Sequence, residues 1–151
     1  MKYLFTIALM GCILLIGCNN EDNLPTLFSS IEGEWELAEV RFQWEPDLDD
    51  LVLPLDGYKF NPDNTFSRTR EFDVEVTQFG NGTYVIEPAH EEDVNALYYV
   101  TLNYERGEEM IGNCEGGGYE EGKEYLFISS EKRLRNTWGE CDGPTYIYNK
   151  K

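Results

Sequence analysis

Apolar and polar residues alternate along much of the chain from about residue 34, and this pattern predicts β-strands. In the stretch 65–76 the odd positions are polar, and the even positions are Phe66, Arg68, Arg70, Phe72, Val74 and Val76. Successive side chains of a strand point to opposite faces, so one face of this stretch is apolar apart from two arginines. In the stretch 97–104 one face carries Tyr98, Val100, Leu102 and Tyr104, and the other carries Leu97, Tyr99, Thr101 and Asn103.

Eight segments fit the strand pattern, and turn-forming residues separate them. We expect strands over 34–44, 57–61, 65–77, 82–87, 97–105, 124–129, 132–138 and 145–149. The sequences "NPDN", "FGNG", "SSEK" and "ECDGP" between them are rich in residues that reverse a chain. No segment predicts a long helix. The sequence therefore indicates an all-β fold, an antiparallel eight-stranded barrel or sandwich.

The first predicted strand changes phase along its length. Trp35 and Leu37 share one parity, whereas the other parity carries Ala38, Val40, Phe42 and Trp44. A β-bulge near Leu37 would turn both sets toward the core and bend the strand.

The N-terminus has the order of a secretory signal peptide. Lys2 supplies a positive charge, residues 4–15 are mostly apolar, and the small residue Gly17 precedes Cys18. The apolar run is shorter than the roughly 20 residues that cross a bilayer. A signal peptide is therefore favoured over a permanent membrane span.

The segment "LIGC" at 15–18 resembles the lipobox of bacterial lipoproteins. The resemblance implies that Cys18 is acylated and becomes the mature N-terminus, the alternative being an uncleaved or ordinarily cleaved leader. We expect a signal peptide over 1–17, a lipidated N-terminus and tether over 18–30, and a single domain over 31–151. Contact with the membrane is expected through this anchor.

The mature chain is strongly acidic. Loss of Lys2 with the leader leaves 11 basic and 29 acidic residues. Such a charge repels nucleic acid and anionic membrane surfaces and favours cationic partners, so no nucleic-acid partner is expected.

Two cysteines remain once Cys12 is removed and Cys18 is acylated. Cys114 and Cys141 would then meet in an oxidising compartment, where a disulfide is expected. This bond would pin the long loop 106–122. A zinc site on these cysteines is disfavoured, because the sequence has one histidine, His90, and zinc usually takes four ligands.

The sequence contains few of the motifs that indicate catalysis. It contains neither a G-x-S-x-G nor an H-E-x-x-H pattern, which excludes the common hydrolase and metalloprotease motifs. Asp47, Asp49 and Asp50 could offer oxygens to a hard cation, but the glycine and final glutamate of an EF-hand are missing, so a solvated loop is favoured. We expect a non-enzymatic protein without cofactor or metal.

The segment "IEGEWELAEV" resembles the start of lipocalin-like proteins, in which Gly-x-Trp opens the first strand after a helical turn. The segments "YKFNPDNTF", "GTYVIE" and "LRNTWGECDGPTYIYNKK" resemble strand pairs of small lipocalin-like lipoproteins of Bacteroidetes-type bacteria. The resemblance places Trp35 at the motif tryptophan under a basic side chain, for which Lys150 is the candidate. The lipocalin Thr-Asp-Tyr motif is absent.

The same resemblance implies an outer-membrane location. Glu21 and Asp22 follow Cys18 where this bacterial group carries an acidic signal for surface export. The domain would face either the periplasm or the cell surface.

The predicted ligand site is the face that carries Arg68 and Arg70, together with Phe66 and Phe72. An eight-stranded barrel has room for one small ligand, and a guanidinium fork suits a carboxylate or phosphate. Inward-facing arginines need either an acid on a neighbouring strand or an anionic ligand. A bulge at Thr69, or a stretch that overhangs the barrel, would instead leave both arginines exposed to water.

Two functions remain open at this level. The first is a lipoprotein that binds a small apolar or anionic molecule inside the barrel. The second is an interaction module with a filled core that binds a protein or a glycan. The presence or absence of an interior cavity distinguishes them.

Overall fold

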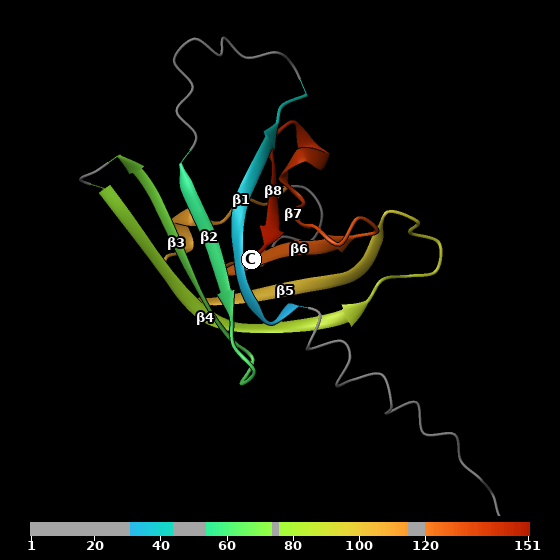
Figure 1. Ribbon diagram of the computed structural model, residues 1–151, viewed down its shortest axis with the longest axis horizontal. Helices are drawn as coiled ribbons and strands as arrows, with labels where there is room; N and C mark the ends of the chain where they lie inside the picture. Colours follow the sequence, from blue (N-terminus) through green and yellow to red (C-terminus); the bar gives the residue numbers. More distant parts are fainter. Residues whose placement is uncertain (1–30, 44–53, 74–75, 115–119) are drawn as a thin grey trace, which may run out of the picture.

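The protein is an antiparallel β-barrel closed by eight strands. The computed structural model describes residues 31–43, 54–73, 76–114 and 120–151, with the backbone alone at 72 and 73. The strands follow one another around the barrel in sequence order (Figure 1). They are β1 (Gly33–Arg41), β2 (Leu55–Phe60), β3 (Thr65–Asp73), β4 (Val76–Pro88), β5 (Ala96–Arg106), β6 (Lys123–Ser129), β7 (Leu134–Asn136) and β8 (Thr145–Lys150). The all-β, eight-stranded prediction is confirmed.

The bulge expected in the first strand is present. The register of β1 against β8 shifts between Leu37 and Glu39, and the strand then continues to Arg41. β1 pairs with β2 from Gly33 to Glu36, whereas it pairs with β8 from Trp35 to Arg41. The bulge therefore lies just after the last residue of β1 that pairs with β2, and beyond it β1 pairs with β8 alone.

The turn predicted at "FGNG" is wrong. Phe79, Gly80 and Gly82 lie inside β4, and the chain reverses between β3 and β4 instead. A Cβ on Gly82 would lie 1.9 Å from the carbonyl oxygen of Asn103 on β5. These glycines serve the close approach of neighbouring backbone and side chains rather than a turn.

The strand predicted over 65–77 is correspondingly too long. Val76 begins β4 and is 52% exposed, so it does not share the buried face of Arg68. Of the two alternating faces of β5, the one with Tyr98 faces the core, since Val100, Leu102 and Tyr104 are buried and Tyr98 packs against the core.

An aromatic and aliphatic core fills the end of the barrel near the start of β1. The indole of Trp35 is 2% exposed and donates a hydrogen bond from Nε1 to the carbonyl oxygen of Ile31 at 2.7 Å. Lys150 Nζ lies 5.9 Å from the centroid of this indole, so a basic side chain covers Trp35 as expected. Phe60, Phe66 and Tyr84 are further aromatic members of this core.

The opposite end of the barrel carries the connection between β5 and β6 and that between β7 and β8. These contain the short 3₁₀ helices η2 (Glu108–Met110) and η3 (Trp138–Cys141). A disulfide joins Cys114 to Cys141, with their Cα atoms 5.5 Å apart. The predicted disulfide is confirmed, and the connection after β5 is fastened across this end.

Several predictions fall on residues outside the described ranges. They include the signal peptide, the lipidated Cys18 with its tether, and the carboxylates Asp47, Asp49 and Asp50. Within the described ranges, no helix has both the length and the hydropathy that a membrane span requires.

Candidate functional site: an ion cluster inside the barrel

Two arginines and two carboxylates meet inside the barrel, each brought there by strand alternation. Arg68 and Arg70 lie on the inner face of β3, Asp56 on that of β2, and Glu124 on that of β6. Counted over the whole residue, backbone included, Asp56, Arg68 and Glu124 are 5%, 1% and 1% exposed. Water cannot solvate these buried charges, so each must be compensated by an opposite charge or a hydrogen bond within the protein.

Asp56 binds both arginines. Arg68 donates from Nε to Oδ1 at 3.0 Å and from Nη2 to Oδ2 at 2.8 Å, which is the parallel, two-pronged arrangement of a guanidinium and a carboxylate. Arg70 donates from Nε and Nη2 to Oδ2 at 2.9 and 2.7 Å. The acid on a neighbouring strand that the sequence left open is therefore present.

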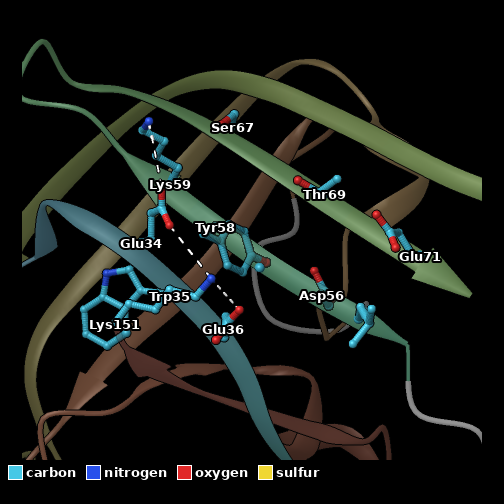
Figure 2. A pocket seen from close by; sticks show the side chains of 12 residues that line it. Glu34, Trp35, Glu36, Asp56, Tyr58, Lys59, Ser67, Thr69, Glu71 and Lys151 are labelled. Atoms are coloured by element: carbon cyan, nitrogen blue, oxygen red, sulfur yellow. Dashed lines mark ion pairs between the residues drawn. The ribbon is translucent and has the colours of Figure 1, made fainter.

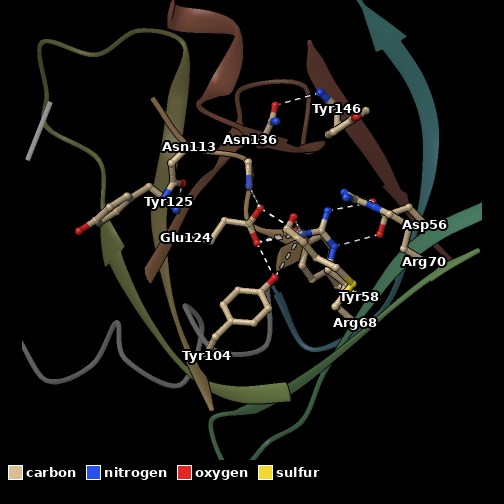
Figure 3. Close-up of polar contacts among 12 residues, drawn as sticks. Asp56, Tyr58, Arg68, Arg70, Tyr104, Asn113, Glu124, Tyr125, Asn136 and Tyr146 are labelled. Carbon is tan, nitrogen blue, oxygen red and sulfur yellow. Dashed lines mark hydrogen bonds and ion pairs between the residues drawn. The ribbon is translucent and has the colours of Figure 1, made fainter. Parts of the chain in front are cut away.

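Arg68 also reaches the other side of the barrel interior. Its Nη1 donates to Glu124 Oε1 and Oε2 at 3.1 Å and to the carbonyl oxygen of Met110 at 2.8 Å. Its Nη2 donates to the Tyr148 hydroxyl at 3.2 Å. A guanidinium has five N–H donors, and all five of Arg68 point at protein oxygens. Figure 3 shows this guanidinium between Asp56 and Glu124.

Tyrosine hydroxyls complete the cluster. Tyr58 and Tyr104 donate to Glu124 Oε2 at 3.0 and 2.6 Å, and Tyr148 donates to Asp56 Oδ2 at 3.1 Å. The Tyr58 ring also lies under Arg68, whose Cζ is 4.6 Å from the ring centroid. The backbone N–H of Gly112 donates to Glu124 Oε1 at 3.2 Å, which ties the cluster to the connection after β5.

The formal charges of the two arginines and the two carboxylates balance. Burial raises the pKa of Asp56, but the charges and hydrogen bonds of Arg68 and Arg70 outweigh it, so the net pKa lies below the usual value. Burial raises the pKa of the Tyr58, Tyr104 and Tyr148 hydroxyls above their ordinary range. At neutral pH the tyrosines are neutral donors and Asp56 is a charged acceptor.

The structure brings together three of the four residues predicted for the ligand site. Arg68 and Arg70 are buried, which excludes the exposed arrangement with a bulge at Thr69. Phe66 packs edge-on against Tyr104 with ring centroids 4.9 Å apart. The side chain of Phe72 lies outside the described part of the chain. A ligand-binding role for these residues stays a prediction.

The two carboxylates were not predicted from the sequence, although the same alternation could have found them. Asp56 shares its parity with Tyr58 and Phe60, which are both buried. Glu124 likewise shares its parity with Leu126 and Ile128. The partners Met110 and Gly112 carry no such signal, because their backbone groups make the contacts.

A pocket of about 350 Å³ opens on the outer surface where β1 and β2 part. Its rim carries Glu34, Glu36, Lys59 and Lys151, which Figure 2 shows joined by ion pairs. Residues of β3 form the other side, including Ser67 and Thr69. Asp56 and Tyr58 of the ion cluster also line this pocket, so it borders the cluster.

No group of His, Cys, Asp and Glu side chains in the described ranges is arranged to hold a metal ion. No protein-family model, curated protein or solved structure matches this chain. The lipocalin-like resemblance therefore rests on the sequence segments that carry it.

Proposed function

We propose that this protein is a non-enzymatic, membrane-anchored lipoprotein whose barrel has a filled core and acts through its outer surface. The observation that supports this function is the complete use of the five Arg68 donors by groups of the protein itself. An anionic ligand would have to displace a buried carboxylate to reach this guanidinium, and that exchange is costly inside a protein. A scaffold that presents its exterior fits the cluster better than a ligand-binding calyx.

The residues of the cluster are also poorly suited to proton transfer. A general acid or base works best when its pKa lies near the operating pH. The pKa of Asp56 is shifted downward and those of Tyr58, Tyr104 and Tyr148 upward, in each case away from neutrality. This direction favours a structural role for the four groups.

The membrane anchor is proposed from the leader and Cys18, and the disulfide is in keeping with it. Structural disulfides persist in oxidising compartments, and Cys114 and Cys141 form one. The proposed location is the bacterial outer membrane, on its periplasmic face or at the cell surface.

Native mass spectrometry of the chain released from bacterial membranes tests the proposal. We expect the mass of the acylated chain from Cys18 onward with one disulfide and no further bound molecule. Cys18→Ala should lose the acyl mass and leave the membrane fraction. A small molecule that co-purifies with the protein and is lost on Arg68→Met would contradict the filled-core function, whereas retention of the anchor in Cys18→Ala would contradict the lipoprotein assignment.

Binding of a small molecule is the second candidate, and the outer pocket favours it. Its volume of about 350 Å³ is within the range of small-molecule sites. If this pocket is used, a co-purifying molecule should be lost on Thr69→Trp, which fills the pocket, and kept on Arg70→Met.

A further inference from the structure

The outer faces of β4, β5 and β6 carry an unusual run of apolar side chains. We define the outer aromatic face as Val85, Leu97, Tyr99, Tyr125 and Phe127. Val85 and Leu97 are 51% and 40% exposed, and the three rings are partly exposed. Outward positions of an antiparallel barrel in water are usually polar, so this face departs from the ordinary pattern.

Strand register makes these side chains one surface. Tyr99 on β5 lies directly across from Phe127 on β6. Thr101, the next outward residue of β5, lies across from Tyr125 on one side and from Val85 on the other. Residues directly opposite on one face of a sheet have their Cβ atoms about 5 Å apart. The face is therefore continuous across three strands.

One side of this face has an acidic rim. Glu87 is exposed and lies across from Tyr99 in the register of β4 and β5. Asp93 accepts a hydrogen bond from the Tyr99 hydroxyl at 2.8 Å, and this bond lowers the pKa of Asp93. Glu91 and Glu92 are exposed in the same connection. The rim is thus negatively charged and joined to the aromatic centre through Tyr99.

The negative charge of the rim discriminates between the partners that could bind this face. On the other side of the face, Arg135 lies across from Phe127 and is paired with Glu131. A second copy of the chain would therefore bring mainly acidic groups to the contact, and like charges repel. An anionic membrane surface is repelled for the same reason. A basic protein segment is attracted, and the aromatic centre resembles the core of a protein interface, where Tyr and Phe are enriched.

We propose that the outer aromatic face docks a protein segment that is apolar in its middle and carries lysine or arginine at its edge. The inference rests on the proposed function, in which the barrel acts through its exterior. Leu97 and Tyr99 provide the apolar contact, and Glu87 with its acidic neighbours selects the basic edge. Electrostatic attraction at such a rim mainly increases the association rate and the specificity.

The test uses the full chain in detergent micelles and a fluorescent peptide of alternating leucines flanked by lysines. Binding is followed by fluorescence anisotropy. The double variant V85K/L97K blocks the face, and L55K/V76K is its matched control. Leu55 and Val76 are 73% and 52% exposed, so both doubles replace two exposed apolar residues with the same added charge.

We expect V85K/L97K to weaken peptide binding at least about tenfold and L55K/V76K to change it within about twofold. A peptide flanked by glutamates should bind far more weakly, and added salt should weaken the lysine peptide. Circular dichroism checks that both doubles remain folded.

Four results would overturn the docking proposal. They are no saturable binding of the lysine peptide, equal weakening by the two doubles, equal binding of the glutamate peptide, and displacement of the peptide by a neutral cello-oligosaccharide, which would assign the face to glycan. These outcomes leave the filled core intact. A small molecule that co-purifies with the protein and is lost on Arg68→Met would instead contradict the proposed function.

Discussion

Arg68 and Asp56 form a two-pronged ion pair across the inner faces of β3 and β2, with donor–acceptor distances of 3.0 and 2.8 Å. Both side chains are essentially inaccessible to water, with exposed fractions of 1% and 0%. Arg70 uses the same carboxylate, so one aspartate holds two guanidinium groups. Loss of the Asp56 charge would therefore leave two buried guanidinium groups without their shared carboxylate.

Asp56→Asn should lower the free energy of unfolding by about 3–5 kcal/mol, because it leaves the buried charges unbalanced. Urea unfolding followed by tryptophan fluorescence measures this. The control Glu105→Gln changes an exposed carboxylate and should stay within about 0.5 kcal/mol of the wild-type value. A loss below about 1 kcal/mol for Asp56→Asn would mean that the cluster is not tightly coupled.

Arg68→Met should destabilise the protein more than Arg70→Met. Methionine keeps an apolar stem in both variants. Arg68 connects Asp56 to Glu124, so its loss unpairs one carboxylate and removes contacts to Met110 and Tyr148. We expect a difference of roughly 2 kcal/mol or more between the two variants in the same unfolding assay. Equal losses would contradict the central position of Arg68.

Alkaline pH should destabilise the barrel steeply from about pH 10. The pKa values of Tyr58, Tyr104 and Tyr148 are raised in the folded state, so unfolded chains lose these protons first. Stability is then full below the ordinary tyrosine pKa of about 10 and falls as the pH rises, by about 1.4 kcal/mol per pH unit for each group. Tyr148→Phe removes one of these groups and should reduce the slope of stability against pH by about 1.4 kcal/mol per pH unit.

Absorbance at 295 nm provides the readout for the alkaline limb. Phenolate signal from the buried tyrosines should appear only together with the loss of circular dichroism. Early ionisation of all tyrosines in a folded protein would show that the three hydroxyls are accessible to solvent.

Alternation along the strands was enough to predict an all-β barrel or sandwich of eight strands and the bulge near Leu37, but it left open whether Arg68 points inward or into water. The length of the strand after Thr65 was not predictable in this way, because Gly80 and Gly82 look like turn residues in sequence. Their role depends on Asn103 and Met110, which are distant in the chain. Alternation could have found Asp56 and Glu124, but their pairing with Arg68 depends on how the barrel closes.

Removal of the disulfide should loosen one end of the barrel. In the double variant C114S/C141S the loss of stability should be about 3–4 kcal/mol, from the added chain entropy of the unfolded state across a separation of 27 residues. Hydrogen exchange should also accelerate at Gly112, whose N–H donates to Glu124. Unchanged protection at Gly112 would show that the cluster holds this connection without the disulfide.

The arginine side-chain signals in an NMR spectrum of the labelled protein test the filled core most directly. If all five Arg68 donors are bonded to protein oxygens, its four Nη protons should give separate, slowly exchanging resonances, while exposed Arg41 gives an averaged signal. These resonances should not move when phosphate, acetate or fatty acid is added. A single averaged Arg68 signal, or one that shifts with an added anion, would contradict a closed cluster. Either result would support ligand binding inside the barrel.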